Sequence, residues 1–183
     1  MDIKDFTWDS DSIRWNHKGR NIALNLQDIN FANLEVNQKH IYVVCGKDFS
    51  ENQIYYLSYE GKKIFEYNKK LGGISWEHNG EIIDINCDYI ENARLYVEEE
   101  VVMVITRTRQ GNGKLLGFKL NGMLLFEQVV PEEYQLLYLS SINNRPSVVT
   151  EGSKKHADSY GRNTWHCMID IKTGKLSKAN LAY

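Results

Sequence analysis

Short segments rich in tyrosine, valine, isoleucine and phenylalanine follow one another along the whole chain, separated by polar turns. Residues 53–59 show the period most clearly, because Tyr55 and Tyr59 fall on one face of an extended strand and Tyr56 on the other. No segment keeps a helical period of 3.6 residues for more than two turns. Proline, which would interrupt strand ladders, occurs only at Pro131 and Pro146. The pattern therefore predicts an all-β protein.

An internal repeat of 61 residues organises these segments, since residues 15–68 align without a gap on residues 76–129. Each copy opens with a predicted hairpin that turns at Lys18-Gly19 or at Asn79-Gly80. Asn-Gly favours a type I′ turn, because both central residues need a positive φ, and the same dipeptide recurs at residues 121–122. Identical residues at equivalent positions include Trp15 and Trp76, His17 and His78, Gly61 and Gly122, and Phe65 and Phe126.

A third, shorter unit lacks the opening hairpin and carries Gly174 where the first two units have Gly61 and Gly122. It also contains an insertion, the polar segment 151–163. The units, about 15–75, 76–133 and 134–183, predict three four-stranded meanders and two extra hairpins in a single all-β domain, residues 1–183. Meanders of this kind form β-propeller blades, but 61 residues exceed the usual blade of about 40–45. We therefore expect a small, irregular or incomplete β-propeller-like array.

The strand-turn-strand segment at residues 168–176, MIDIKTGKL, resembles the quinoprotein-like β-propeller repeat, whose blades often carry an aspartate followed by Thr-Gly-Lys before the last strand. Residues 59–67, YEGKKIFEY, and residues 120–128, LNGMLLFEQ, are similar to the same turn. This resemblance implies a fold and not an activity, because nothing in the chain matches the ligands of a quinone cofactor.

Composition and charge exclude several classes of protein. The 183 residues carry a formal net charge of −2 and have a pI of about 6.2, which argues against direct binding of nucleic acid, since that needs a basic surface. The longest apolar run, Val101–Ile105, is far shorter than the ~20 residues of a membrane span, and the acidic first residues do not read as a signal peptide. We expect a cytoplasmic protein without membrane contact.

Candidate chemistry is sparse. Three cysteines, Cys45, Cys87 and Cys167, show no metal-ligand spacing, and we expect reduced thiols, at least two of them packed as small hydrophobic residues. His17 and His78 each precede a turn glycine and read as structural or exposed turn residues, so no metal site is predicted. No nucleophile motif or phosphate-binding loop occurs. The sequence thus predicts neither a catalytic residue nor a cofactor.

Two groups of residues are candidates for binding a protein partner. The acidic run Glu98–Glu100 stands where the first repeat has Asn37-Gln38-Lys39, so the turn itself does not require acids. An acidic surface would attract a basic partner, whereas the alternative is a solvated turn. The insertion is either a recognition loop or a flexible decoration. The candidate partner-binding residues are Asp84, Asp88, Glu91, Glu98, Glu99, Glu100, Lys154, His156, Tyr160 and Arg162.

These features favour a non-enzymatic module that binds another protein. In general character the chain resembles the small immunity proteins that bacteria encode beside secreted polymorphic toxins, including those of contact-dependent growth inhibition. The resemblance implies a protein that neutralises a cognate toxin by blocking its active site, with a basic toxin domain, such as a nuclease, as the partner. The alternatives are a carbohydrate- or ligand-binding β module that uses tyrosine and tryptophan, and a subunit of a larger β assembly.

Overall fold

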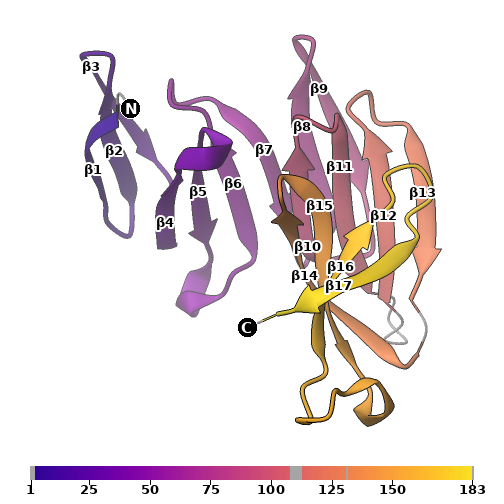
Figure 1. The fold of residues 1–183 in the computed structure, drawn as a ribbon. Helices are drawn as coiled ribbons and strands as arrows, with labels where there is room; N and C mark the ends of the chain where they lie inside the picture. Colours follow the sequence, from indigo (N-terminus) through magenta and orange to yellow (C-terminus); the bar gives the residue numbers. More distant parts are fainter. Residues whose placement is uncertain (1–2, 108–112, 131, 183) are drawn as a thin grey trace. The chain divides into compact units, whose positions relative to one another are not determined.

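The computed structural model describes residues 3–107, 113–130 and 132–182, and in these ranges the chain forms seventeen β-strands and three short 3₁₀ helices (Figure 1). The strands make four antiparallel sheets of three, six, four and four strands. The all-β prediction is confirmed. Residues 1–85 and residues 86–183 form two compact units, called unit 1 and unit 2 below. The assignment of the whole chain to a single domain stays a prediction.

Unit 1 contains a three-stranded sheet in the order β1-β2-β3 and a six-stranded sheet in the order β4 to β9. Its core joins residues of both sheets, among them Ile13, Trp15, Ile41 and Leu57. The indole nitrogen of Trp15 donates a hydrogen bond of 2.7 Å to the carbonyl of Tyr59. The elements are β1 (Ile3–Trp8), β2 (Ser12–His17), β3 (Arg20–Asn25), β4 (Ile29–Glu35), η1 (Val36–Gln38), β5 (His40–Cys45), η2 (Lys47–Phe49), β6 (Gln53–Leu57), β7 (Lys63–Asn68), β8 (Gly73–His78) and β9 (Glu81–Asn86).

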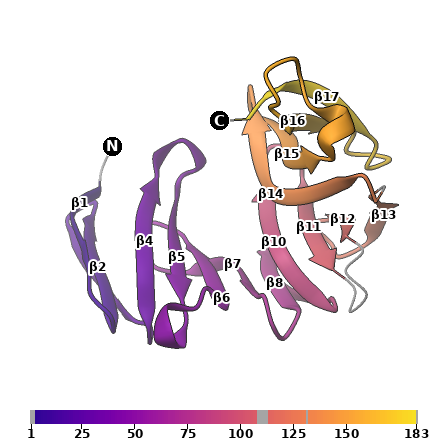
Figure 2. The ribbon, with the colours of Figure 1, turned by 90° about the horizontal axis from the view of Figure 1, so that it is seen from below.

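Unit 2 contains two four-stranded sheets, β10 to β13 and β14 to β17. Strands β10 and β14 run beside each other (Figure 2), and the Tyr96 hydroxyl donates a hydrogen bond of 2.7 Å to the carbonyl of Ser140 between them. The third repeat lacks an opening hairpin, as predicted. The elements are β10 (Tyr89–Tyr96), β11 (Val101–Arg107), β12 (Gly113–Lys119), β13 (Leu124–Val129), β14 (Tyr134–Ile142), β15 (Arg145–Gly152), η3 (Lys154–His156), β16 (Thr164–Ile169) and β17 (Leu176–Leu181).

The 61-residue repeat is confirmed by the strand positions, because β2 to β7 recur as β8 to β13 with the same spacing. Both opening hairpins have the predicted turn geometry: φ is 51° and 77° at Lys18 and Gly19, and 53° and 81° at Asn79 and Gly80. The structure adds one strand to the repeat. Strand β1 pairs with β2 as β7 pairs with β8, so β1 is the equivalent of β7 at the start of the first repeat.

The turn at Asn121-Gly122 differs from the opening hairpins. Only Gly122 has a positive φ, 85°, and its amide donates a hydrogen bond of 2.9 Å to the carbonyl of Lys119. The same arrangement occurs at Gly61, with a φ of 87° and a bond to the carbonyl of Ser58. These are three-residue turns that end in a glycine bulge, so the turn predicted at this Asn-Gly is present, with a geometry different from that of the opening hairpins.

Phe126 packs differently from its equivalent in the first repeat. Phe65 pairs across the strands with Tyr56, and the two ring centroids lie 4.8 Å apart. In unit 2 the tyrosine is replaced by Gly117, and the Phe126 ring lies directly over this glycine and over Gly174, so that a Cβ on either would overlap the ring. The two phenylalanines are therefore both buried, but only Phe126 depends on glycines beneath it.

The cysteines are unpaired, and Cys45 and Cys167 are buried as small hydrophobic residues, as predicted for at least two of the three. Burial raises the pKa of the Cys45 thiol to about 11 and that of Cys87 to about 11. No helix in the described ranges is long and apolar enough to cross a membrane.

Candidate functional site

The acidic run lies where the sequence places it, in the turn between β10 and β11. Glu100 has a φ of 52° and donates its amide to the carbonyl of Val97 over 3.2 Å, while the first-repeat equivalent Lys39 has a φ of 57° and makes the same bond to Val36. The backbone is therefore the same with and without acidic side chains. Glu98 and Glu100 are exposed.

The other predicted acids of unit 2 do not join this run. Asp84 is exposed on β9 in unit 1, and Asp88 is exposed at the beginning of unit 2. Glu91 is half-buried, and its carboxylate lies 3.2 Å from Arg107 Nε, so an ion pair already neutralises it. In β10, Glu91 stands close to the end that pairs with Arg107, whereas Glu98 follows the opposite end. Seven residues of extended strand separate them by roughly 20 Å.

The tip of the insertion is a tight turn built around Asp158. The carboxylate accepts the backbone amides of Tyr160 and Arg162 over 2.8 and 2.9 Å, and it also accepts the Arg162 guanidinium over 2.7 Å. Hydrogen bonds from Arg162 and these amides hold the pKa of Asp158 below its ordinary value. Gly161, with a φ of 78°, closes the turn. The turn presents Tyr160, which is 83% exposed, with the Arg162 guanidinium 5.2 Å from the centre of its ring.

The base of the insertion is fastened to strands β14 and β15. The backbone amide of Gly152 donates to the carbonyl of Asn163 over 2.9 Å, and the Asn163 side-chain amide donates back to Gly152 over 2.6 Å. The amide of Ser153 donates to the carbonyl of Glu133 over 2.8 Å. Both ends of the insertion are therefore fixed, which favours a recognition loop over a flexible decoration.

His156 fixes the middle of the insertion. Its Nε2 lies 2.8 Å from the Glu133 carboxylate and its Nδ1 lies 2.9 Å from the Tyr134 hydroxyl. A carboxylate can only accept, so Nε2 donates to Glu133, and in the neutral ring with this tautomer Tyr134 donates to Nδ1. The Tyr134 and His156 ring centroids are 4.5 Å apart, and Gly152 leaves room for both rings. His156 is thus a positioning residue rather than a free surface group, while the predicted Lys154 is exposed.

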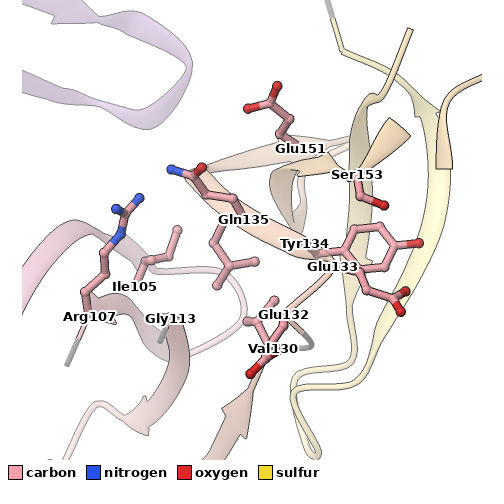
Figure 3. A pocket seen from close by; sticks show the side chains of 12 residues that line it. Ile105, Arg107, Gly113, Val130, Glu132, Glu133, Tyr134, Gln135, Glu151 and Ser153 are labelled. Atoms are coloured by element: carbon pink, nitrogen blue, oxygen red, sulfur yellow. The ribbon is translucent and has the colours of Figure 1, made fainter. Parts of the chain in front are cut away.

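Beside the insertion lies a pocket of about 410 Å³ within unit 2. The polar ends of Arg107, Gln135 and Glu151 lie to one side of it, and Tyr134 and Glu133 to the other (Figure 3). Its lining comes from the ends of β11 and β15, the beginnings of β12 and β14, and the connection before β14. The lining residues are Ile105, Arg107, Gly113, Val130, Glu132, Glu133, Tyr134, Gln135, Leu136, Glu151, Gly152 and Ser153.

None of the pocket residues is among the sequence-based candidates, although the insertion and Glu91, which pairs with the pocket-lining Arg107, lie at this end of unit 2. Glu133 and Tyr134 contact a histidine more than twenty residues away, and no local spacing encodes that contact. The turn at residues 158–162 did carry a usable signal, because an aspartate followed three residues later by a glycine, as in Asp158 and Gly161, is typical of a side-chain-capped turn.

The recurring histidines do not assemble a metal site. His17 is buried, with its Nε2 3.4 Å from a Glu60 carboxylate oxygen, and its ring lies beside Tyr59. His78 contacts the side-chain amide of its neighbour Asn79. Among the described residues, no group of three or more histidine, cysteine, aspartate or glutamate side chains has the geometry of a metal site.

No protein family matches the chain, and no curated protein is significantly similar to it. Solved structures give low similarity: a proposed 6-phosphogluconolactonase from Bacteroides fragilis has a TM-score of 0.42 at 10% identity, over 93% of this chain and 65% of that one. A second, from Bacteroides uniformis, has a TM-score of 0.41 at 10% identity, over 95% and 68%. The extracellular region of plexin A4 has a TM-score of 0.35 at 16% identity, over 85% and 18%. The chain spans less than two thirds of the Bacteroides fragilis protein. At these scores the likenesses assign neither a family nor an activity.

Proposed function

We propose that this chain is a non-enzymatic protein-binding module and that its binding surface is the end of unit 2 that carries the insertion. The observation that carries the proposal is Tyr160, a large aromatic side chain that is 83% exposed on a turn held by at least three hydrogen bonds to Asp158. Exposed tyrosines on fixed loops are typical anchors of protein interfaces, because little conformational freedom is lost on binding.

The role we propose within this class is that of a cytoplasmic immunity protein that neutralises a cognate secreted toxin. Two features support this role: the general character of the chain, and the negative charge of Glu132 and Glu151, which are exposed at the proposed surface. A basic toxin domain would be drawn to these carboxylates. The acidic turn at Glu98–Glu100 lies at the opposite end of β10, so it belongs to a separate surface.

Replacement of Tyr160 by alanine tests the proposal. The tagged protein captures its partner from the producing strain, mass spectrometry identifies it, and surface plasmon resonance measures its binding to each variant. We expect Tyr160→Ala to weaken binding by about 2 kcal/mol or more, roughly thirtyfold, while leaving the free energy of unfolding within about 0.5 kcal/mol of wild type.

Tyr138→Ala is the matched control, because it removes another exposed tyrosine of unit 2 from a strand rather than from the insertion. Its affinity should equal that of wild type. Equal affinity of the Tyr160→Ala variant and wild type would reject the insertion as the binding surface.

A further inference from the structure

We propose that the pocket of unit 2 receives the cationic end of a lysine or arginine side chain from the protein partner. This inference rests on the proposed function and assigns the pocket a ligand of defined chemistry. The pocket volume of about 410 Å³ lies in the range of sites that bind small groups specifically, and it has ample room for one long side chain.

The charges around the pocket favour a cation. Three glutamates and one arginine line it, and Arg107 is already paired with Glu91 over 3.2 Å. Glu133 is held by His156 over 2.8 Å. Glu132 and Glu151 are exposed, and neither forms an ion pair with a residue in the described ranges. Within the described ranges, these two carboxylates therefore have no ion-pair partner and remain open to a ligand.

The lining also fits the stem of such a side chain. Ile105, Val130 and Leu136 contribute an apolar base, against which the methylene groups of lysine or arginine would lie while the charged end stays at the rim. Gln135 and Ser153 supply polar groups beside the two carboxylates. An anionic ligand would meet like charges, and a wholly apolar ligand would leave the carboxylates without a partner.

The position of the pocket connects it to the insertion. Glu151, Gly152 and Ser153 belong to the pocket lining, and the insertion begins with these residues. Hydrogen bonds from Ser153 to Glu133 and between Gly152 and Asn163 fix this boundary. A basic residue in the pocket and a contact at Tyr160 would therefore engage two parts of one rigid loop, so the two contacts can be made together by a single partner.

A peptide titration tests the inference without the partner. The probe is the pentapeptide Gly-Gly-Arg-Gly-Gly, blocked at both ends, and its reference carries citrulline, which has the same shape without the charge. Binding is followed by nuclear magnetic resonance through the δ1 methyl group of Ile105. The test variant is Glu132→Gln/Glu151→Gln. The control is Glu98→Gln/Glu100→Gln, which removes the same charge from the opposite end of unit 2.

We expect the arginine peptide, but not the citrulline peptide, to shift the Ile105 methyl resonance saturably. The test variant should weaken this binding about five- to tenfold, from the loss of two partly exposed charge pairs, and the control should leave it unchanged. Equal binding of the two peptides, equal loss in both variants, or no shift at Ile105 would overturn the inference. Loss of partner binding in Tyr160→Ala alongside a failed peptide titration would refute the pocket assignment alone.

Discussion

Replacement of Gly117 by alanine tests the packing that distinguishes unit 2 from the first repeat. Gly117 lies opposite Phe126 on the neighbouring strand, and a Cβ at this position would overlap the phenylalanine ring. The backbone there is not in the left-handed region, so alanine brings no conformational strain. Any loss of stability must then come from the collision with the ring.

The expected loss follows from two opposing terms. Forcing an extra methyl group into a packed site costs about 1–3 kcal/mol, while replacing glycine by alanine in an unstrained position stabilises by about 0.4–1 kcal/mol through the unfolded chain. We expect Gly117→Ala to destabilise by about 1–2 kcal/mol. Phe126→Ala should cost about 3–5 kcal/mol, because it empties a buried site. In the double variant the new methyl group enters the vacated space, so the second substitution should cost nothing further.

Urea unfolding followed by tryptophan fluorescence measures all four free energies of unfolding and hence the coupling between the two positions. Gly113→Ala is the matched control, since this glycine begins the same strand and its Cβ would meet nothing within 4 Å. It should be neutral or slightly stabilising. A Gly117→Ala variant as stable as wild type would refute the reasoning, as would an equal loss with and without Phe126.

Three further predictions concern the surface and the thiols. Hydrogen bonds lower the pKa of Asp158 below 3.8, so the turn at the insertion tip should persist through pH 4 and loosen only as the pH falls through the lowered pKa. Titration of the carboxyl carbon resonance of Asp158 from pH 6 downward measures this pKa directly. A pKa at or above 3.8 contradicts the prediction. Replacing Glu98–Glu100 by glutamine should change the free energy of unfolding by less than about 0.5 kcal/mol and leave partner association unaltered across salt concentrations, which binding kinetics would check. With a pKa of about 11, only about one in a thousand of the Cys45 and Cys87 thiols is ionised at pH 8, so both should react with a disulfide reagent far more slowly in native protein than in urea. Equal rates would show that the fold does not suppress their ionisation.

Local sequence signals predicted the repetitive part of the fold well. The turns at Lys18-Gly19 and Asn79-Gly80 were predictable because they need backbone conformations that few residues tolerate. The repeat then predicts each strand of the second copy from its equivalent in the first. Strand β1 was not predicted, because Ile3–Trp8 carries too few of the residues that identify β7. The turn at Asn121-Gly122 is where the dipeptide predicts it, but its three-residue loop gives it a different geometry from the opening hairpins, because loop length also selects the turn type.

The candidate site was less predictable, because its contacts join distant parts of the chain. The sequence singled out the insertion and His156, but Tyr134 and Glu133 reach this histidine only through the pairing of β14 with β15. A charge run in the sequence also does not show which acids meet on one surface: Glu91 and Glu98 are near in sequence yet stand toward opposite ends of an extended strand. Extended strands separate neighbours in sequence, and only the sheet pairing shows which side chains meet.

Hydrogen exchange of the protein with and without its partner tests the location of the binding surface most directly. The account predicts protection of backbone amides in residues 152–163, where the insertion carries Tyr160, and no change in residues 97–101, at the opposite end of β10. Protection confined to residues 97–101, with the insertion exchanging as in the free protein, would contradict it.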